Sequence, residues 1–266
     1  MTKNETHNDS LFLEINNAIA TIFINRINKR NALSYEMWTK VPAIMKACEE
    51  NSEVKVIIFR SVDASAFSAG ADISDFKNLC KTAEGAKKYN DAIIAAEAAI
   101  MNISKPTIAQ IQGFCVGGGC EIAIACDFRF ADSSGRFGIT PAKLGLIYNT
   151  PGTKNLVDLV GPSKAKDILF TGRLLPAEEA LSIGLIDHIF SSEMLEKETL
   201  EYAKMIANNA QLSVRSSKRI IFDVLQGETE NTEEIDDMIV NSFLSDDFKE
   251  GVNAFLEKRR ANFKYS

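Results

Sequence analysis

The segment "GFCVGGGCEIAIACD", residues 113–127, places the strongest constraint on how this chain folds. Three consecutive glycines, Gly117 to Gly119, interrupt an apolar stretch, and a carboxylate, Glu121, follows two residues later. The residues up to Gly113 are typical of a buried strand, and those after the glycines are typical of a buried helix. The sequence therefore predicts a strand, a glycine loop and a helix, with one acidic side chain inside the core.

This turn is suited to holding a developing negative charge. The first N–H groups of a helix have no intrahelical acceptor and lie at the positive end of the helix dipole. Glycine lets a substrate approach that backbone closely. Gly118 and Glu121 are three residues apart, so they face roughly the same side of the first turns. A carboxylate beside an anion-binding N–H is an arrangement for proton transfer next to an oxyanion.

A structural role is the alternative, in which the glycines only pack a helix against a strand and Glu121 forms a salt bridge. The dinucleotide fingerprint, the phosphate-binding P-loop and the G-x-S-x-G elbow are all absent from the sequence. A second small-residue loop, "AFSAGADI" at 66–73, follows the strand-like "VKVIIFRS". It offers an N–H at Ala71, and two loops after two strands can supply the paired donors of an oxyanion hole.

Strands alternate with helices in the first part of the chain, and helices dominate the last part. A predicted strand pair over 11–25 precedes a helix whose N-cap is Ser34, and residues 62–76 are expected to form a loop. This order predicts an α/β core domain over residues 1–200, followed by a helical region over 201–266.

Composition narrows the function classes. A net charge of −6 in 266 residues argues against a general nucleic-acid-binding surface. The five cysteines form no CxxC pair and are expected as free thiols, and the first ten residues carry no apolar signal core. No uncharged run is long enough to cross a membrane. With only two histidines, a histidine-rich metal site is not expected. We therefore expect a cytoplasmic protein without a metal.

The two loops together resemble those of the crotonase, or enoyl-CoA hydratase/isomerase, superfamily. The resemblance extends over nearly the whole chain and includes four further stretches: "NRINKRNALS" (25–34), "FGITPAKLGL" (137–146), "FTGRLLPAEEALSIGLIDHIF" (170–190) and "EGVNAFLEKRRANF" (250–263). The order of the stretches along the chain also matches.

The resemblance implies a spiral of ββα units with a C-terminal helical trimerisation region, assembled as a homotrimer or homohexamer. It implies acyl-CoA thioesters as substrates, with coenzyme A entering as part of the substrate and no separate cofactor. The thioester oxygen would be held by the N–H groups of Ala71 and Gly118, and Glu121 would be catalytic. Coenzyme A contacts map to Lys29, Arg30, Ala69, Asp72, Ile73, Phe255 and Lys258. The last two would reach a neighbouring subunit's site, although Lys258 also suits an exposed helix charge, and Asp72 is expected mainly to shape its loop.

One departure from the family pattern bears on the chemistry. Hydratases of this family carry a second catalytic glutamate four residues after a phenylalanine, and here Phe137 is followed at that spacing by Pro141. Some isomerases of the family place an aspartate near the position of Asn149, which is not a base. A lone Glu121 is less suited to hydration, since that reaction uses both a base for water and an acid for the α-carbon.

The replacement pattern suggests an alternative reaction. "TPAKLGLIYN", residues 140–149, is similar to methylmalonyl-CoA decarboxylases of the superfamily, and Tyr148 would occupy the position of their active-site tyrosine. Decarboxylation needs an oxyanion hole and a proton source but no base. Those enzymes have histidine where this chain has Ala71, and Tyr148 also suits a plain role in the pocket wall.

Three functions therefore stay open from the sequence. The first is an enoyl-CoA hydratase or isomerase that uses Glu121. The second is a decarboxylase of a methylmalonyl-CoA-like ester that uses Tyr148. The third is a non-catalytic protein that binds acyl-CoA or RNA, which the acidic composition and the two intact loops disfavour.

Overall fold

The computed structural model describes residues 9–264, and the polar segment before residue 9, expected to lack a signal sequence, lies outside the described residues. The chain begins with the antiparallel pair β1 (Leu11–Asn16) and β2 (Ile19–Ile24), as expected, with a tight turn at Asn17 and Ala18. Both turn residues have positive φ, which a two-residue hairpin requires.

The main sheet has six strands in the order β1-β2-β3-β5-β7-β10. All of its pairs after β1–β2 are parallel. Its further strands are β3 (Val56–Ser61), β5 (Thr107–Ile111), β7 (Phe128–Asp132) and β10 (His188–Phe190). Strands β3 and β5 are apolar throughout most of their length because helices cover one face and α7 the other, as is usual for parallel strands buried on both faces.

A second sheet of four strands runs in the order β4-β6-β8-β9. Its strands are β4 (Ala66–Ser68), β6 (Phe114–Val116), β8 (Arg136–Gly138) and β9 (Leu175–Pro176). Along the chain, β3, β5 and β7 enter the main sheet, and the strand after each enters the second sheet. This alternation confirms the expected spiral of ββα units. The expected loop over 62–76 is wrong in part, because it contains β4 and the start of α2.

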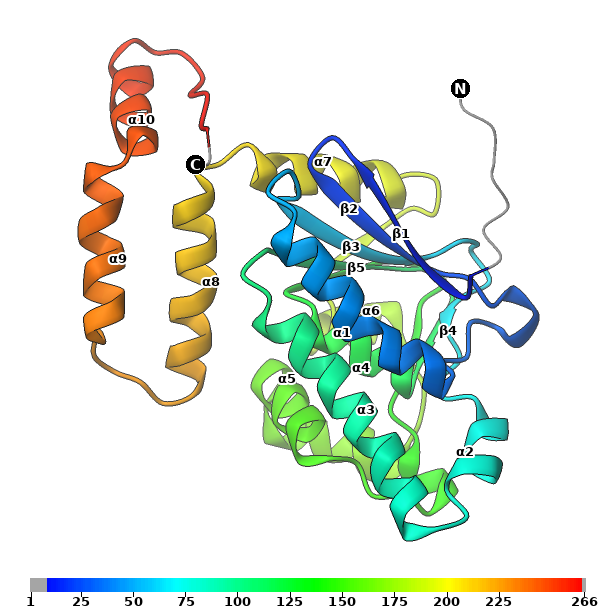
Figure 1. Ribbon diagram of the computed structural model, residues 1–266. Coiled ribbons are helices and arrows are strands. Elements are labelled where there is room, and N and C mark those ends of the chain that lie inside the picture. Colours follow the sequence, from blue (N-terminus) through cyan, green and yellow to red (C-terminus); the bar gives the residue numbers. More distant parts are fainter. Residues whose placement is uncertain (1–8, 265–266) are drawn as a thin grey trace.

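Helices complete each unit and fill the space beside the sheets (Figure 1). Ser34 caps the first long helix as expected, by accepting a hydrogen bond from the Met37 N–H. The core helices and short 3₁₀ turns are η1 (Ile27–Lys29), α1 (Tyr35–Glu50), α2 (Ile73–Leu79), α3 (Ala83–Asn102), α4 (Gly118–Ala125), η2 (Pro141–Leu144), α5 (Thr150–Thr171), α6 (Ala177–Ser182) and α7 (Leu195–Ala207).

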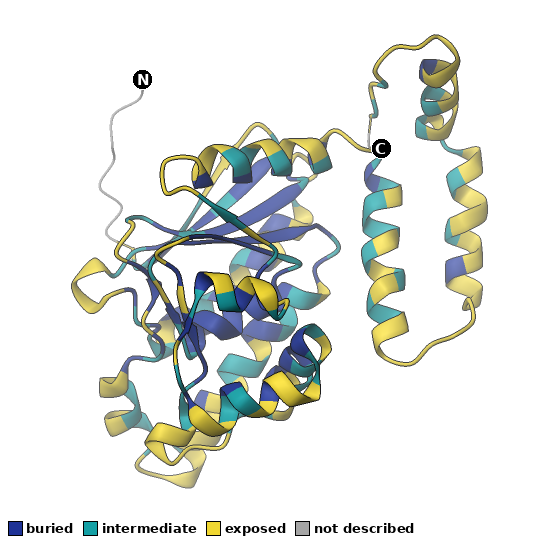
Figure 2. Cartoon of the chain, turned by 180° about the vertical axis from the view of Figure 1, so that it is seen from behind, coloured by how far each residue is buried: buried dark blue, intermediate teal, exposed yellow. Residues whose placement is uncertain are grey.

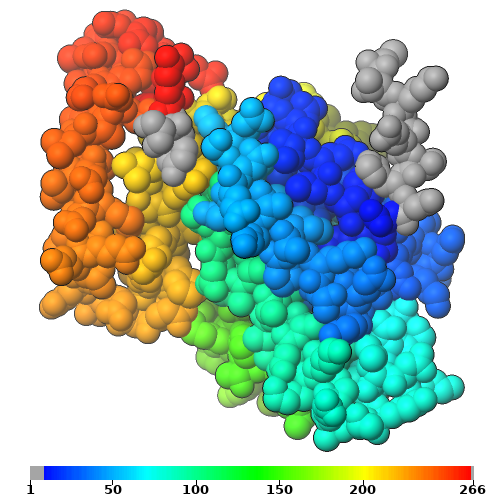
Figure 3. Space-filling view, viewed as in Figure 1, coloured from blue at the N-terminus to red at the C-terminus, as the bar shows by residue number. Residues whose placement is uncertain are grey.

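Three more helices form a C-terminal extension: α8 (Gln211–Leu225), α9 (Glu233–Leu244) and α10 (Asp246–Leu256). They stand beside the core, and Figure 2 shows that most of their residues are exposed. In the space-filling view they form one flank of the molecule (Figure 3). The Lys218 ammonium tethers α8 to the core, through the Asp127 carboxylate at 2.8 Å and the Lys105 carbonyl at 3.0 Å.

The boundary expected between residues 200 and 201 falls inside α7. That helix packs against the strands of the main sheet and buries Leu195 and Ala203 there. It therefore belongs to the core, and the helical region that leaves the core begins at Gln211. No helix in the described part of the chain is both long and apolar enough to span a membrane.

Candidate active site

The two glycine-containing loops meet at one point of the molecule. A Cβ built on Gly117 would lie 3.6 Å from the Gly70 Cα, so the backbones touch. Gly118 is the first residue of α4 and has no intrahelical acceptor for its N–H. The Ala71 N–H likewise donates to no backbone carbonyl within residues 9–264. The fold thus brings together the two N–H groups that the sequence singled out, in an arrangement that can bind an oxyanion.

The glycines are also required for packing. Gly117 has a φ of +50°, which residues with a side chain rarely adopt. A Cβ on Gly119 would lie 2.9 Å from the Ser68 carbonyl oxygen, so only glycine lets α4 approach β4 this closely. The packing alternative is therefore correct for these two glycines. The expected salt bridge of Glu121 is wrong, because no cation in the described chain pairs with this carboxylate.

A clasp formed by residues 26–33 fixes the Ala71 loop. The Leu33 N–H donates to the Gly70 carbonyl at 2.7 Å, and the Asp72 N–H donates to the Leu33 carbonyl at 2.9 Å. The buried Asn31 amide donates to the Ala66 carbonyl at 2.7 Å. These bonds leave the Ala71 N–H between two fixed neighbours, which holds its direction.

The sequence-predicted residues Lys29 and Arg30 lie on this clasp, with both side chains exposed. The Arg30 carbonyl accepts a hydrogen bond from the Ala69 N–H at 3.0 Å, so the clasp and the loop run side by side. Ile73, at the start of α2, is 56% exposed, which is unusual for isoleucine. The two cations and this apolar side chain lie on the solvent side of the loop.

Asp72 is the N-cap of α2. Its carboxylate accepts hydrogen bonds from the Ser74 N–H and hydroxyl and pairs with the Arg26 guanidinium at 2.8 Å. These contacts, the Ser74 hydroxyl first, lower the pKa of Asp72 to about 2. These contacts use the Asp72 carboxylate to hold its loop, which is the role expected from the sequence.

A cavity of about 580 Å³ opens beside the paired N–H groups. Its wall includes Ala69, Ala71, Ile73, Gly118, Glu121 and Tyr148, which joins both loops to the segment before α5. Most other lining side chains are apolar, and among them are Phe76, Ile93, Val116, Ile139, Leu144 and Ile147. Such a cavity suits a short acyl chain attached to a carbonyl that faces the two N–H groups.

Glu121 is the one charged side chain in this wall, and it is 8% exposed. Burial, together with the charge of a second carboxyl, Glu97, raises the pKa of its carboxyl to about 8. The carboxyl is thus poised to exchange protons near neutral pH, a property common among catalytic acids and bases.

Glu97 lies on α3 and was not predicted from the sequence as a functional residue. It is 1% exposed, and burial raises its pKa to about 7. In the described chain neither of its oxygens has a partner within bonding distance, although the Asn149 amide lies near enough to lower its pKa. A lone glutamate in the apolar stretch "AIIAAEAAIM" was the available signal, since an acidic residue on a buried helix face needs an explanation.

Tyr148 and Pro141 both line the cavity. The Tyr148 hydroxyl is buried and has no partner among the described residues. Burial and the nearby Glu121 and Glu97 charges raise the pKa of Tyr148, so it stays a hydrogen-bond donor. Pro141 adds a wall surface but no acid or base where the hydratase pattern has glutamate. Asn149 caps α5 by accepting from the Gly152 N–H at 2.7 Å.

Phe255 and Lys258 are not brought to this cavity within one chain. Phe255 is 83% exposed at the end of α10 and borders a separate hollow in the extension. Lys258 is exposed just beyond that helix. Their expected contact with coenzyme A in another subunit's site stays a prediction.

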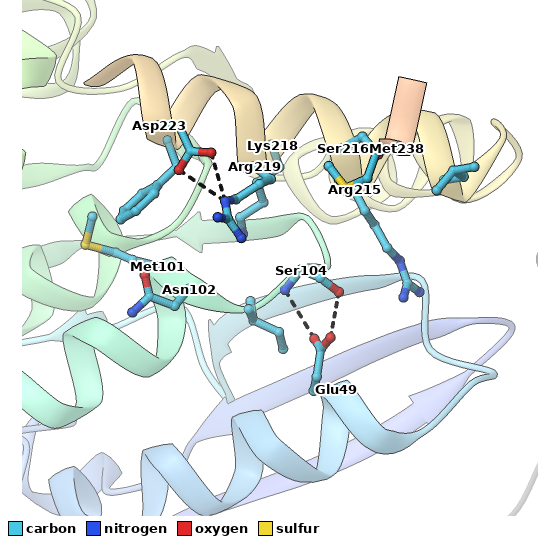
Figure 4. A pocket seen from close by; sticks show the side chains of 13 residues that line it. Glu49, Met101, Asn102, Ser104, Arg215, Ser216, Lys218, Arg219, Asp223 and Met238 are labelled. Atoms are coloured by element: carbon cyan, nitrogen blue, oxygen red, sulfur yellow. Dashed lines mark hydrogen bonds and ion pairs between the residues drawn. The ribbon is translucent and has the colours of Figure 1, made fainter. Parts of the chain in front are cut away.

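A further cavity of about 570 Å³ lies between α8 and the C-terminal ends of α1 and α3 (Figure 4). Its polar side chains pair with one another. Arg219 binds Asp223 at 2.9 Å, and the Ser104 hydroxyl donates to Glu49 at 2.7 Å. None of the residues predicted from the sequence to be functional lines it. The cavity beside Ala71 and Gly118 is therefore the candidate active site.

Comparisons with known proteins agree with this geometry. The family model described as enoyl-CoA hydratase/isomerase matches residues 14–266. The chain is 35% identical over 256 residues to crotonyl-CoA hydratase of Syntrophomonas wolfei, covering 96% of this chain and 98% of that protein. It is 33% identical over 253 residues to methylmalonyl-CoA decarboxylase of Escherichia coli, covering 93% and 95%.

A solved structure of an enoyl-CoA hydratase/isomerase family protein from Hyphomonas neptunium superposes with a TM-score of 0.95. The two chains are 42% identical, and the match covers 98% of this chain and all of that one. The paired loops, the buried carboxyl and these matches along nearly the whole chain lead to one conclusion: the protein is an enzyme of the enoyl-CoA hydratase/isomerase family.

Proposed function

We propose that this enzyme hydrates or isomerises short-chain enoyl-CoA thioesters, with Glu121 moving the protons. The observation that carries the proposal is the position of Glu121 in an apolar cavity beside the N–H groups of Ala71 and Gly118. A thioester carbonyl held by these two donors would develop negative charge at its oxygen, where the donors stabilise it.

In hydration, Glu121 would act first as the base and then as the acid, by carrying one proton from water to C2. The oxygen of water forms a bond to C3 of the enoyl group while Glu121 accepts the water proton. The electrons of the C2–C3 double bond move into the thioester as an enolate. Glu121 then passes the same proton to C2, so water is added across the double bond and the carboxyl returns to its starting state.

Isomerisation of a 3-enoyl thioester uses the same group. Glu121 removes a proton from C2, the two N–H groups hold the enolate, and the proton returns to C4 as the double bond moves. One carboxyl serves both steps, so the replacement of the family's second glutamate by Pro141 is compatible with this reaction.

Decarboxylation is the second candidate, and the Escherichia coli relative and the unpartnered Tyr148 hydroxyl favour it. The cavity wall weighs against it, because its lining residues include no lysine, arginine or histidine to hold the carboxylate of a malonyl ester. Glu121, the one carboxyl in the wall, would repel that carboxylate when ionised, so a decarboxylase would have to keep Glu121 protonated.

The coenzyme A moiety would extend from the cavity mouth past Ala69, Asp72 and Ile73. Lys29 and Arg30, exposed beside that loop, suit its phosphate groups. Phe255 and Lys258 would come from a neighbouring subunit of a homotrimer or homohexamer, since they lie away from this chain's own cavity. All five cysteines are free thiols, which fits a reducing, cytoplasmic compartment and a role in fatty-acid metabolism.

Absorbance of the conjugated thioester tests the proposal. Wild-type enzyme should consume the absorbance of crotonyl-CoA by hydration or generate it from 3-butenoyl-CoA by isomerisation. Glu121→Gln removes the proton carrier with little change of shape, so the rate should fall by about 10²–10⁴-fold. Tyr148→Phe, the matched control in the same wall, should leave the rate nearly unchanged.

Two other results would contradict the proposed hydratase or isomerase activity. If methylmalonyl-CoA releases CO₂, if both enoyl thioesters are inert, and if Tyr148→Phe slows CO₂ release, the enzyme is a decarboxylase. If no thioester reacts and the protein binds RNA with a steep salt dependence, the non-catalytic function is correct instead.

A further inference from the structure

A polar cluster that the reaction above does not fully use lies beside the lining of the cavity. Helix α3 contributes Tyr89 and Ile93 to the cavity wall, and Glu97 is the next residue along that face, one turn beyond Ile93. Helices α3 and α4 pack against each other, and the Glu97 carboxyl is near enough to raise the pKa of Glu121. Glu121 reaches the cavity, whereas Glu97 does not line it.

An unpartnered buried carboxyl costs stability and is rare unless it has a function. Glu97 is more deeply buried than Glu121, and within residues 9–264 both of its oxygens lack a hydrogen-bond partner. An apolar side chain would fill the same space at lower cost. Because Glu97 lies beside Glu121, the one carboxyl of the cavity, we expect its function to involve Glu121.

No cation compensates the pair. Two titratable side chains face it, Tyr148 in the segment before α5 and Tyr89 on α3, and neither carries a positive charge. In the described chain, no lysine, arginine or histidine lies near enough to lower the pKa of either carboxyl. Two neighbouring buried carboxyls without a counter-ion cannot both ionise readily, so they share a proton.

We propose that Glu97 is the proton partner of Glu121, and that the buried pair holds one proton during catalysis. This inference rests on the proposed function and gives Glu121 a second carboxyl as a neighbour, outside the cavity lining rather than at the position of Pro141. While Glu97 carries the shared proton, Glu121 is ionised and can accept a proton from water or from C2. Once Glu121 has delivered that proton to carbon, the pair is restored, so it gains and loses no proton over a cycle. Glu97 is a positioning residue, because it acts through Glu121 rather than on the substrate.

Glu97→Gln tests this role, because it keeps the shape and removes the charge. In wild type, kcat/KM for the reactive enoyl thioester should fall again at high pH, where the pair loses its shared proton and both carboxyls are ionised. In the variant no second carboxyl can lose a proton, so this basic limb should disappear. The acidic limb should stay in place, because Glu121 ionises beside a neutral neighbour in both proteins. Asp91→Asn, an exposed site on the same helix that pairs with Lys87, is the matched control and should change neither quantity.

A second measurement needs no substrate. Infrared spectra of the substrate-free enzyme should show a protonated carboxyl band that persists at neutral pH in wild type and in Asp91→Asn. The band should titrate at lower pH in Glu97→Gln and in Glu121→Gln. If Glu97→Gln does not fold, Glu97→Met takes its place, since an apolar side chain suits the buried site.

The outcomes separate this inference from the proposed function. A basic limb of kcat/KM that persists in Glu97→Gln would overturn the proton-partner role and leave the enoyl-CoA activity in place. A wild-type enzyme that is inert on enoyl thioesters would overturn the activity, and the infrared titration would still decide whether the two carboxyls share a proton. Absence of a protonated carboxyl band at neutral pH would rule out the pair.

Discussion

At the scale of single residues, the site depends on two carboxyl groups that are buried, although carboxyls ordinarily lie in water. Glu97 and Glu121 lie in an apolar environment that favours their neutral forms. The unfolded chain exerts no such effect, so the pair of carboxyls takes up a proton on folding near neutral pH. The stability of the enzyme must therefore depend on pH in a way that these two residues control.

For Glu97 the sign follows from its raised pKa. Its contribution is most favourable below pH 4.5, where it is protonated in both states, and is lost as the pH rises through about 7. The full penalty is about 3 kcal/mol. Glu97→Gln should therefore gain stability over wild type as the pH is raised from 4.5 to 8, as measured by denaturant unfolding. Asp91→Asn should follow the wild-type curve, and a Glu97→Gln curve parallel to wild type would show that this carboxyl is not buried in its neutral form.

Ala71 and Gly118 were predicted from the sequence and Glu97 was not, and the reason is physical. Ala71 and Gly118 act through the backbone, and the small residues that allow such a backbone form a recognisable local pattern. Glu97 matters because of what packs against it. A helix face alone does not tell which of its residues meets Glu121 across another helix, so this group emerged only with the fold.

At the scale of elements, the short helix α2 and its cap hold the oxyanion loop. Asp72 satisfies the first turn of α2 and binds Arg26, and its own N–H pairs with Leu33. Helix α2 has seven residues and no fully buried side chain, so packing alone secures it poorly. The cap is thus a main determinant of where Ala71 points.

Replacement of Asp72 should separate its cap from its charge. Asp72→Ala removes both and should cost about 1–2 kcal/mol of stability. It should also raise KM and lower kcat, because the Ala71 N–H loses its fixed direction. Asp72→Asn keeps an N-cap of similar strength and should retain most of both properties. Thermal unfolding together with steady-state kinetics makes the comparison, and equal activity of Asp72→Ala and wild type would contradict this account.

Elements with strong periodicity were predicted well, but the short strand β4 was not. The strand pair, α1 with its Ser34 cap, and the α4 turn all appear as expected. Strand β4 has only three residues, and its position depends on pairing with β6 from a distant segment. A strand stabilised by a remote partner carries little signal of its own, which explains why 62–76 looked like a loop.

At the scale of the whole molecule, the C-terminal extension exposes several large apolar side chains on one helix, which is typical of an interaction surface. Val240, Phe243 and Leu244 on α9 are 58%, 60% and 69% exposed. The site also lacks the two C-terminal residues, Phe255 and Lys258, that are expected to contact coenzyme A. Both facts agree with assembly through this region.

Charge placed on α9 should disrupt such an assembly. Wild type should sediment as a trimer or hexamer, whereas Val240→Asp with Leu244→Asp should shift to smaller species, because burying two charges in an apolar interface is costly. The variant should also raise KM for the CoA ester. Ile15→Asp on the edge strand β1, where the side chain is 42% exposed, should sediment like wild type. A wild-type monomer with full activity would refute the oligomer.

The alternation of strands between two sheets has a consequence for the order in which the enzyme folds. Each turn of the spiral delivers one part of the site, so Ala71, Glu97, Gly118 and Tyr148 are far apart along the chain and meet only when successive units have stacked. Contacts of such long range form slowly and late during folding. Catalytic competence is therefore among the last properties the polypeptide acquires, and a nascent chain that ends before Tyr148 carries both oxyanion loops without a complete site.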